Sequence, residues 1–122
     1  MAIYSKGLLE DEITKALISW EKDYMGRGPE EAKTDILRNM IIVTMRGVLS
    51  QAERILAREK EGMALIKKLR LQLVEQGRAD LEKILIRVTS VKMVSLHTDI
   101  STKTGERVFI FVMERDIDFL TM

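Results

Sequence analysis

Two short segments of the 122-residue chain carry apolar side chains at both odd and even positions. Residues 34–45 and 107–114 are rich in isoleucine, valine and methionine, a pattern typical of strands that are covered on both faces. A sheet built from such strands needs two covering layers. The sequence therefore predicts either helices on opposite faces of one sheet or, as we favour, a homodimer in which a second copy covers one face.

Three helical segments are predicted around this sheet. An apolar stripe with steps of three and four residues predicts a first helix from Lys6 to Met25, and Pro29 is expected to open a short helical turn. Ser50 and Glu53 form a capping-box signature, which starts a second helix that is expected to reach Glu61. A long helix is predicted from residue 63 to residues 88–89, with a kink or a close helix approach at Gly77.

The C-terminal third predicts a hairpin. Strands are expected over residues 91–98 and 107–114, and the polar segment 99–106 supplies the turn between them. The order is thus α-β-α-α-β-β, an α+β fold with a small, mainly antiparallel sheet of at least three strands packed against a long helix. We expect a single domain over residues 1–122, with a core at about 6–115, a tail at 116–122, and about 6,700 Å² of folded surface.

Composition excludes several classes of function. Twenty Lys and Arg side chains against nineteen Asp and Glu leave a net charge of +1, which argues against nucleic-acid binding. No cysteine and one histidine exclude disulfides, thiol catalysis and zinc ribbons, so no metal, cofactor or catalytic residue is predicted. No apolar run approaches the roughly 20 residues of a membrane helix. We therefore expect a soluble, cytoplasmic protein that is not an enzyme and does not insert into membranes.

The least ordinary stretch of the chain is GRGPEEAKT at residues 26–34. A glycine-rich turn before a helix N-terminus can present backbone N–H groups to an anion, with cationic side chains beside it. The alternative is a helix stop followed by a rigid, solvated turn, and the spacing matches neither a P-loop nor a dinucleotide fingerprint. The candidate residues for binding an anion or a partner are Gly26, Arg27, Gly28, Pro29, Lys33 and Thr34.

His97 and Asp99 are secondary candidates because they share one face of a predicted strand. Ser95 lies on the same face, but adjacent positions on one strand rarely give the geometry of a catalytic triad. The charged residues of the helical region, including Glu53 and Arg70, are predicted to form a solvated helix face.

Several of these segments, in the same order, resemble one family. The first is residues 20–34, which contain the Gly-Arg-Gly-Pro turn and the Ala-Lys-Thr that follows it. The others are residues 49–53 and residues 94–100, the latter before a closing strand at 108–112. Together they are similar to the MpsC-like family, named for a membrane-potential-generating system thought to translocate sodium ions. The similarity covers roughly residues 10–115, and the Gly-Arg-Gly-Pro block is its most specific part.

The resemblance implies a small cytosolic accessory component that works with integral-membrane subunits in ion or inorganic-carbon transport. It implies no catalytic site, and it makes the turn a candidate contact surface in which Arg27 and Lys33 would touch the anion or partner. The favoured function is thus a dimeric, non-enzymatic accessory module. The alternative is a sensor that binds a small anion or nucleotide through the Gly26–Thr34 turn.

Overall fold

The computed structural model describes residues 4–120 of the chain. The helices are α1 (Lys6–Met25), α2 (Gln51–Leu56), α3 (Lys60–Gln76) and α4 (Arg78–Thr89). The strands are β1 (Glu31–Leu37), β2 (Met40–Arg46), β3 (Met93–Ile100) and β4 (Arg107–Met113). The predicted α+β class and antiparallel sheet are confirmed, and the full order is α-β-β-α-α-α-β-β, with one strand and one helix more than expected.

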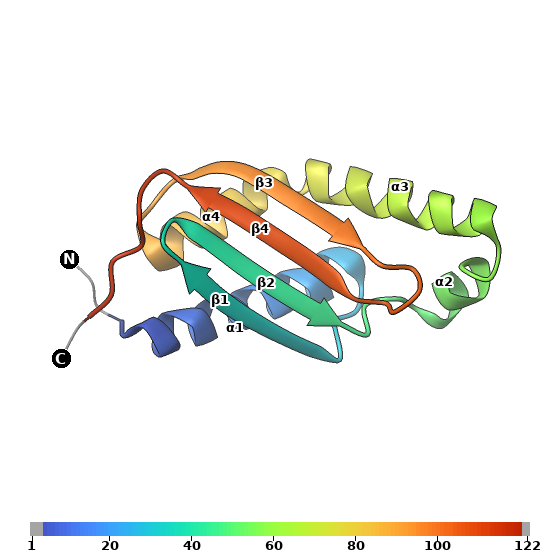
Figure 1. Cartoon of the computed structure of the whole chain (residues 1–122), viewed down its shortest axis with the longest axis horizontal. Helices are drawn as coiled ribbons and strands as arrows, with labels where there is room; N and C mark the ends of the chain where they lie inside the picture. Colours follow the sequence, from blue (N-terminus) through green and yellow to red (C-terminus); the bar gives the residue numbers. More distant parts are fainter. Residues whose placement is uncertain (1–3, 121–122) are drawn as a thin grey trace.

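The strands form one antiparallel sheet in the order β1-β2-β4-β3 (Figure 1). The single strand predicted over residues 34–45 is in fact a hairpin, because the chain reverses at Arg38 and Asn39. Arg38 has a φ of 58°, in the left-handed region that tight two-residue turns require. The predicted C-terminal hairpin is confirmed, and a bulge between Met93 and Ser95 interrupts its register.

The second predicted helix ends earlier than expected. Ser50 and Glu53 form the predicted capping box, with Ser50 Oγ accepting from the Glu53 N–H at 3.1 Å and Glu53 Oε1 accepting from the Ser50 N–H at 2.9 Å. Helix α2 nevertheless stops at Leu56 because the chain folds back there into α3. At this corner Gly62 lies so close to α2 that a Cβ atom would be 1.8 Å from the Leu56 carbonyl oxygen.

The predicted long helix is two helices, α3 and α4, which meet at Gly77. The close approach expected at Gly77 is confirmed, since a Cβ atom there would lie 2.9 Å from Trp20 Cζ2 and 3.1 Å from Tyr24 Cε2. The Tyr24 hydroxyl also donates to the Leu73 carbonyl at 2.9 Å. The end of α1 therefore packs directly on the junction between α3 and α4.

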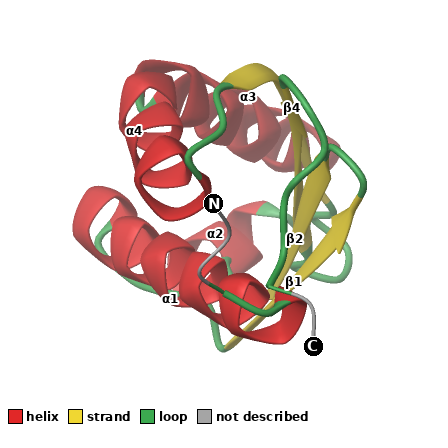
Figure 2. Cartoon of the chain, turned by 90° about the vertical axis from the view of Figure 1, so that its left-hand side faces the viewer, coloured by secondary structure: helices red, strands yellow, loops and turns green. Residues whose placement is uncertain are grey.

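The helices α1, α3 and α4 lie on one side of the sheet, as Figure 2 shows, so the expectation of helices on opposite faces was wrong. The sheet side chains that point toward them include Ile41, Val43, Phe109 and Phe111, which are fully buried with Ile13, Leu17, Leu81 and Leu85. We call the other side of the sheet the open sheet face. It is the front of the molecule in Figure 1, and no helix of the described chain covers it.

The predicted tail contributes to the core. Ile117 is buried, and its N–H donates to the Arg38 carbonyl at 3.1 Å, which ties the segment to the end of the β1–β2 hairpin. Further along, the Leu120 N–H donates to the Tyr4 carbonyl at 2.6 Å. Residues 121–122 of the predicted tail lie outside the described part of the chain.

Candidate functional site

The Gly26–Thr34 segment is an extended connection and not the start of a helix. Gly26 caps the end of α1 by donating its N–H to the Lys22 carbonyl at 3.1 Å, and Gly28 packs against the Lys22 side chain. The helical turn predicted after Pro29 was wrong, because the Glu30 N–H donates to the Arg46 carbonyl at 2.9 Å and begins the pairing of β1 with β2. The segment thus lacks the helix N-terminus on which the predicted anion site depended.

The three polar candidate residues of this segment, Arg27, Lys33 and Thr34, point to separate places. Arg27 Nη1 donates to the Leu49 carbonyl at 2.5 Å, whereas Thr34 is buried and places its hydroxyl 2.7 Å from Thr14 Oγ1. Lys33 lies on the open sheet face with its side chain 76% exposed and its Nζ 3.9 Å from Asp35 Oδ1. The structure therefore does not bring Arg27, Lys33 and Thr34 together.

His97 and Asp99 are exposed side chains on the open sheet face. His97 Nε2 lies 3.2 Å from Ser95 Oγ, and the register of β3 with β4 places Ser95, His97 and Asp99 on one face, as predicted. Asp99 instead faces Lys67 of α3, with Asp99 Oδ1 3.5 Å from Lys67 Nζ, and it accepts from the Ile100 N–H at 2.8 Å. Within residues 4–120, no cluster of three or more His, Asp or Glu side chains is arranged to hold a metal ion.

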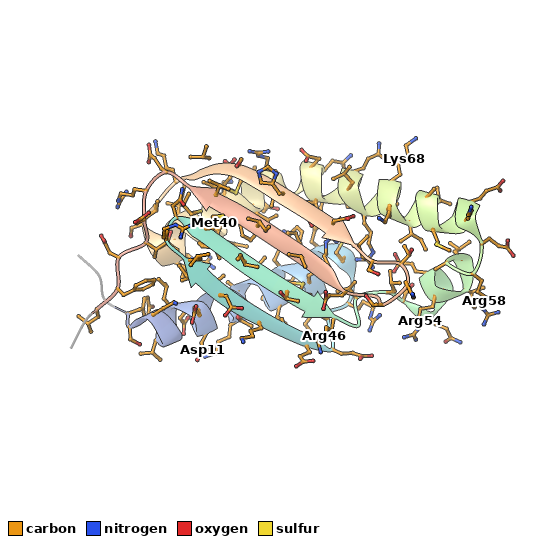
Figure 3. The ribbon with its side chains drawn as sticks, in the orientation of Figure 1. Asp11, Met40, Arg46, Arg54, Arg58 and Lys68 are labelled. Atoms are coloured by element: carbon orange, nitrogen blue, oxygen red, sulfur yellow. The ribbon has the colours of Figure 1, made fainter. Side chains whose placement is uncertain are left out.

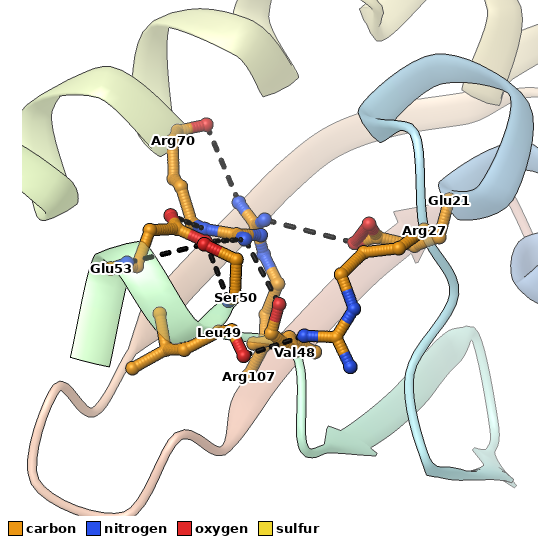
Figure 4. Close-up of polar contacts among 8 residues, drawn as sticks. All are labelled: Glu21, Arg27, Val48, Leu49, Ser50, Glu53, Arg70 and Arg107. Atoms are coloured by element: carbon orange, nitrogen blue, oxygen red, sulfur yellow. Dashed lines mark hydrogen bonds and ion pairs between the residues drawn. The ribbon is translucent and has the colours of Figure 1, made fainter. Parts of the chain in front are cut away.

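The most unusual polar feature is a cluster of four buried or nearly buried charges, which we call the ion cluster: Glu21, Glu53, Arg70 and Arg107 (Figure 4). Arg70 Nε and Nη2 donate to the two carboxylate oxygens of Glu53 at 2.8 and 2.7 Å, the bidentate geometry of strong ion pairs. The same Nη2 also donates to the Val48 carbonyl at 3.0 Å. Arg70 thereby ties α3 to α2 and to the connection that precedes it.

Arg107 extends the ion cluster into the sheet. Its Nη1 lies 3.8 Å from Glu21 Oε1, and both side chains are only 2% exposed. Its Nη2 donates to the Arg70 carbonyl at 3.4 Å, and its guanidinium carbon lies 4.9 Å from the centre of the Phe109 ring. Together with the bond from Arg27 to Leu49, these contacts join α1, the β2–α2 connection, α2, α3 and β4 at one place.

Burial raises the pKa of the two carboxylates of the ion cluster, whereas pairing with arginine lowers it. Burial raises the pKa of Glu21, and the attraction of Arg107 only partly offsets this. Burial also acts to raise the pKa of Glu53, but the hydrogen bonds from Arg70 and from the Ser50 N–H outweigh it and hold that pKa at about 2. Burial lowers the pKa of Arg107 to about 10, so its guanidinium stays charged at neutral pH.

A surface pocket of about 340 Å³ lies between α3 and the β3–β4 hairpin, beside the ion cluster. Its lining includes the cationic side chains Lys67, Lys68, Arg70 and Arg107. Three of these already face a carboxylate, since Lys67 pairs with Asp99, Arg70 with Glu53 and Arg107 with Glu21. The ion pairs of Arg70 with Glu53 and of Arg107 with Glu21 balance the charges of the ion cluster, which links the helices to the sheet.

The expectation that Glu53 and Arg70 belong to a solvated helix face was wrong. Arg70 lies at the same helical phase as the buried Ile66 and Val74, four residues to either side. Arg107 alternates with the buried Phe109 and Phe111 along β4. In both cases the periodicity of the apolar residues in the sequence places an arginine on the buried side of its element, and this signal could have predicted the burial of Arg70 and Arg107.

The pKa of Glu53 leads to a prediction about acid stability. A carboxylate with a folded-state pKa of about 2 and an ordinary value of 4.5 stabilises the fold above pH 4.5, and this contribution is lost as the pH falls toward 2. We expect Glu53→Gln to lower the free energy of unfolding at pH 7, and the gap to wild type to close on acidification. Urea unfolding at a series of pH values measures this. Glu75→Gln, which changes an exposed carboxylate on α3, is the control and should show no such closing gap.

Comparison with known proteins places this architecture in a family. Residues 5–115 match the family model described as "Na+-translocating membrane potential-generating system (MpsC)". The chain is 49% identical over 114 residues to "Uncharacterized protein YbcI" of Bacillus subtilis (strain 168), covering 93% of this chain and 92% of that protein. It is 31% identical over 102 residues to "Uncharacterized protein YrhF" of the same strain, covering 80% of each. No solved structure gives a significant match. A family match over nearly the whole chain and a relative that is nearly half identical show that this chain belongs to the MpsC family.

Proposed function

We propose that the chain is a non-enzymatic, cytoplasmic and dimeric accessory module of a membrane system that transports ions or inorganic carbon. The observation that carries the proposal is the family match over residues 5–115, whose description names a Na+-translocating membrane potential-generating system. None of the helices within residues 4–120 has the length and apolar character needed to cross a bilayer. The proposal therefore assigns contact with the membrane to an integral-membrane transport subunit that this chain binds.

An exposed apolar surface on α2 and α3 supports the proposal of a protein partner. Ile55 and Leu56 are 51% and 45% exposed, and Leu65 and Leu69 are 57% and 49% exposed. Leu65 and Leu69 are one helical turn apart on α3 and so share one side of that helix, while Ile55 and Leu56 lie at the end of α2, whose backbone approaches Gly62 of α3. Large exposed apolar side chains grouped on a small protein are typical of protein contacts.

The Gly26–Thr34 segment gives less support to the alternative function, an anion sensor. Its two cationic side chains, Arg27 and Lys33, lie apart, and the Arg27 guanidinium is already bound to the Leu49 carbonyl. A sensor of this kind predicts a rise in melting temperature with phosphate, bicarbonate or nucleotides that Arg27→Ala abolishes.

Affinity purification from solubilised membranes tests the favoured function. The tagged wild-type chain is expected to retain an integral-membrane transport subunit, and the Leu65→Lys/Leu69→Lys variant is expected to lose it. The matched control is Leu8→Lys, which changes a leucine that is 58% exposed on α1 and should leave the capture unchanged. Recovery of no membrane transport subunit with the wild-type chain, under conditions where it is folded, would contradict the proposal.

A further inference from the structure

The open sheet face has an apolar centre. Cross-strand partners point to the same side of a sheet, so the register places Ile42 of β2 beside Ile110 of β4 on this face. Met40 pairs with Val112 on one side of them, and Thr44 pairs with Val108 on the other. All six residues are partly exposed, and Figure 3 shows Met40 and Arg46 at opposite ends of β2 on the viewer's side of the sheet.

The surface area of the chain shows that it presents more surface than a compact monomer of its size. It exposes 7,665 Å², whereas a monomer of 14.0 kDa is expected to expose about 6,700 Å². The excess of roughly 1,000 Å² is comparable to the roughly 800 Å² that each partner contributes to a standard interface. This excess belongs to the chain as a whole, and it is at least as large as one partner's share of a standard interface.

The charges on the open sheet face favour a second copy as its partner. The strands contribute three carboxylates (Glu31, Asp35 and Asp99) and two cations (Lys33 and Arg46) to this face, all on the edge strands or at a strand end. Each carboxylate already has a cation within 4.0 Å, namely Arg46 for Glu31, Lys33 for Asp35 and Lys67 for Asp99. A face that is nearly neutral and has an apolar centre can pack against its own copy without like-charge repulsion. A strongly charged partner would find no opposite charge on this face to attract it.

We infer that the open sheet face is a homodimer interface in which two copies stack sheet on sheet around a two-fold axis near Ile42 and Ile110. Such an axis sets the apolar centre of one copy against the same centre of the other, as isologous interfaces require. The paired side chains of β1 and β3 then form the polar rim. This inference deepens the dimeric part of the proposed function by naming its surface, and it does not involve the leucines of α2 and α3.

Single substitutions at the centre of the face test the inference. Sedimentation equilibrium of the wild-type chain at micromolar concentration is expected to give twice the mass of 14.0 kDa. Ile110→Lys is expected to give a folded monomer, because a buried interface cannot hold two unpaired lysines near its axis. Leu65→Lys is the matched control, since this exposed leucine lies on α3, and it should leave the dimer intact.

A second variant decides the question if Ile110→Lys does not fold. The chain has no cysteine, so Ile110→Cys introduces its one thiol. Mild oxidation is expected to give a disulfide-linked dimer, while Leu65→Cys stays monomeric on a non-reducing gel. A monomeric wild type overturns both the dimer and its surface. A dimer that survives Ile110→Lys overturns the assignment of the interface to the open sheet face, but not the dimer itself. If the chain still captures a membrane subunit, neither of these two results contradicts the accessory function.

Discussion

Replacing Arg107 by methionine is expected to lower the free energy of unfolding by about 3–5 kcal/mol, the cost of removing one partner of a buried ion pair. Methionine keeps most of the side-chain volume beside Phe109, so the loss comes mainly from leaving Glu21 as an uncompensated carboxylate that is 2% exposed. Denaturant unfolding followed by circular dichroism measures the change. The double variant Arg107→Met/Glu21→Gln should recover part of the stability, because it removes the unpaired charge.

The pH dependence of the same variant gives a second readout. Burial raises the pKa of Glu21 in the wild type, and without the attraction of Arg107 it rises further. The folded state then binds a proton that the unfolded state has released, so stability falls as the pH rises above the ordinary value of 4.5. The stability deficit of Arg107→Met should therefore shrink as the pH falls from 7 toward 4.5. A deficit below 1 kcal/mol at pH 7, or a double variant no more stable than the single one, would show that the pair does not hold the helices to the sheet.

Gly62→Ala is expected to destabilise the protein by about 3 kcal/mol, at the upper end of the usual cost of overpacking. The added Cβ would lie 1.8 Å from the Leu56 carbonyl oxygen, and because that atom is backbone, α2 must move away from α3. Helix propensity favours alanine over glycine by about 1 kcal/mol, so the clash has to exceed this gain for any loss to appear. Moving α2 also breaks the contact between Glu53 and Arg70.

Gly7→Ala is the matched control for this substitution. Gly7 is also helical, but nothing lies within 4 Å of the position that its Cβ would take. Its expected effect is therefore between zero and a gain of about 1 kcal/mol. If Gly62→Ala were as stable as Gly7→Ala in urea unfolding, the result would contradict the close contact between Gly62 of α3 and Leu56 of α2.

The sequence predicted those elements that combine a periodic apolar pattern with a turn or capping signal at their ends. The C-terminal hairpin has a polar turn with glycine and threonine between two β-rich runs, and the capping box of Ser50 and Glu53 starts α2 where expected. The turn between β1 and β2 has neither glycine nor proline, and the polar pair Arg38-Asn39 is the one sign in residues 34–45 that separates two strands from one. The sequence marked Gly77 as a kink or close approach, but its partners Trp20 and Tyr24 are more than 50 residues away in sequence, and only tertiary packing identifies them.

The polar sites were harder to predict than the fold, because a charged residue gives no local sign of its partner. Arg27 and Lys33 are close in sequence and look like one site, but Arg27 binds the Leu49 carbonyl and Lys33 lies on the open sheet face. Arg70 and Arg107 are 37 residues apart and meet only when α3 packs on the sheet. Their positions on buried stripes predict burial, whereas their pairing with Glu53 and Glu21 depends on the three-dimensional arrangement.

The most direct test of the accessory function is the sodium-dependent physiology of a host that lacks this chain. Deletion of the chain is expected to reduce sodium tolerance and to make growth depend on added bicarbonate, and expression of the wild-type chain should restore both. Unchanged sodium tolerance together with unchanged bicarbonate dependence in the deletion strain would contradict a role in the membrane transport system.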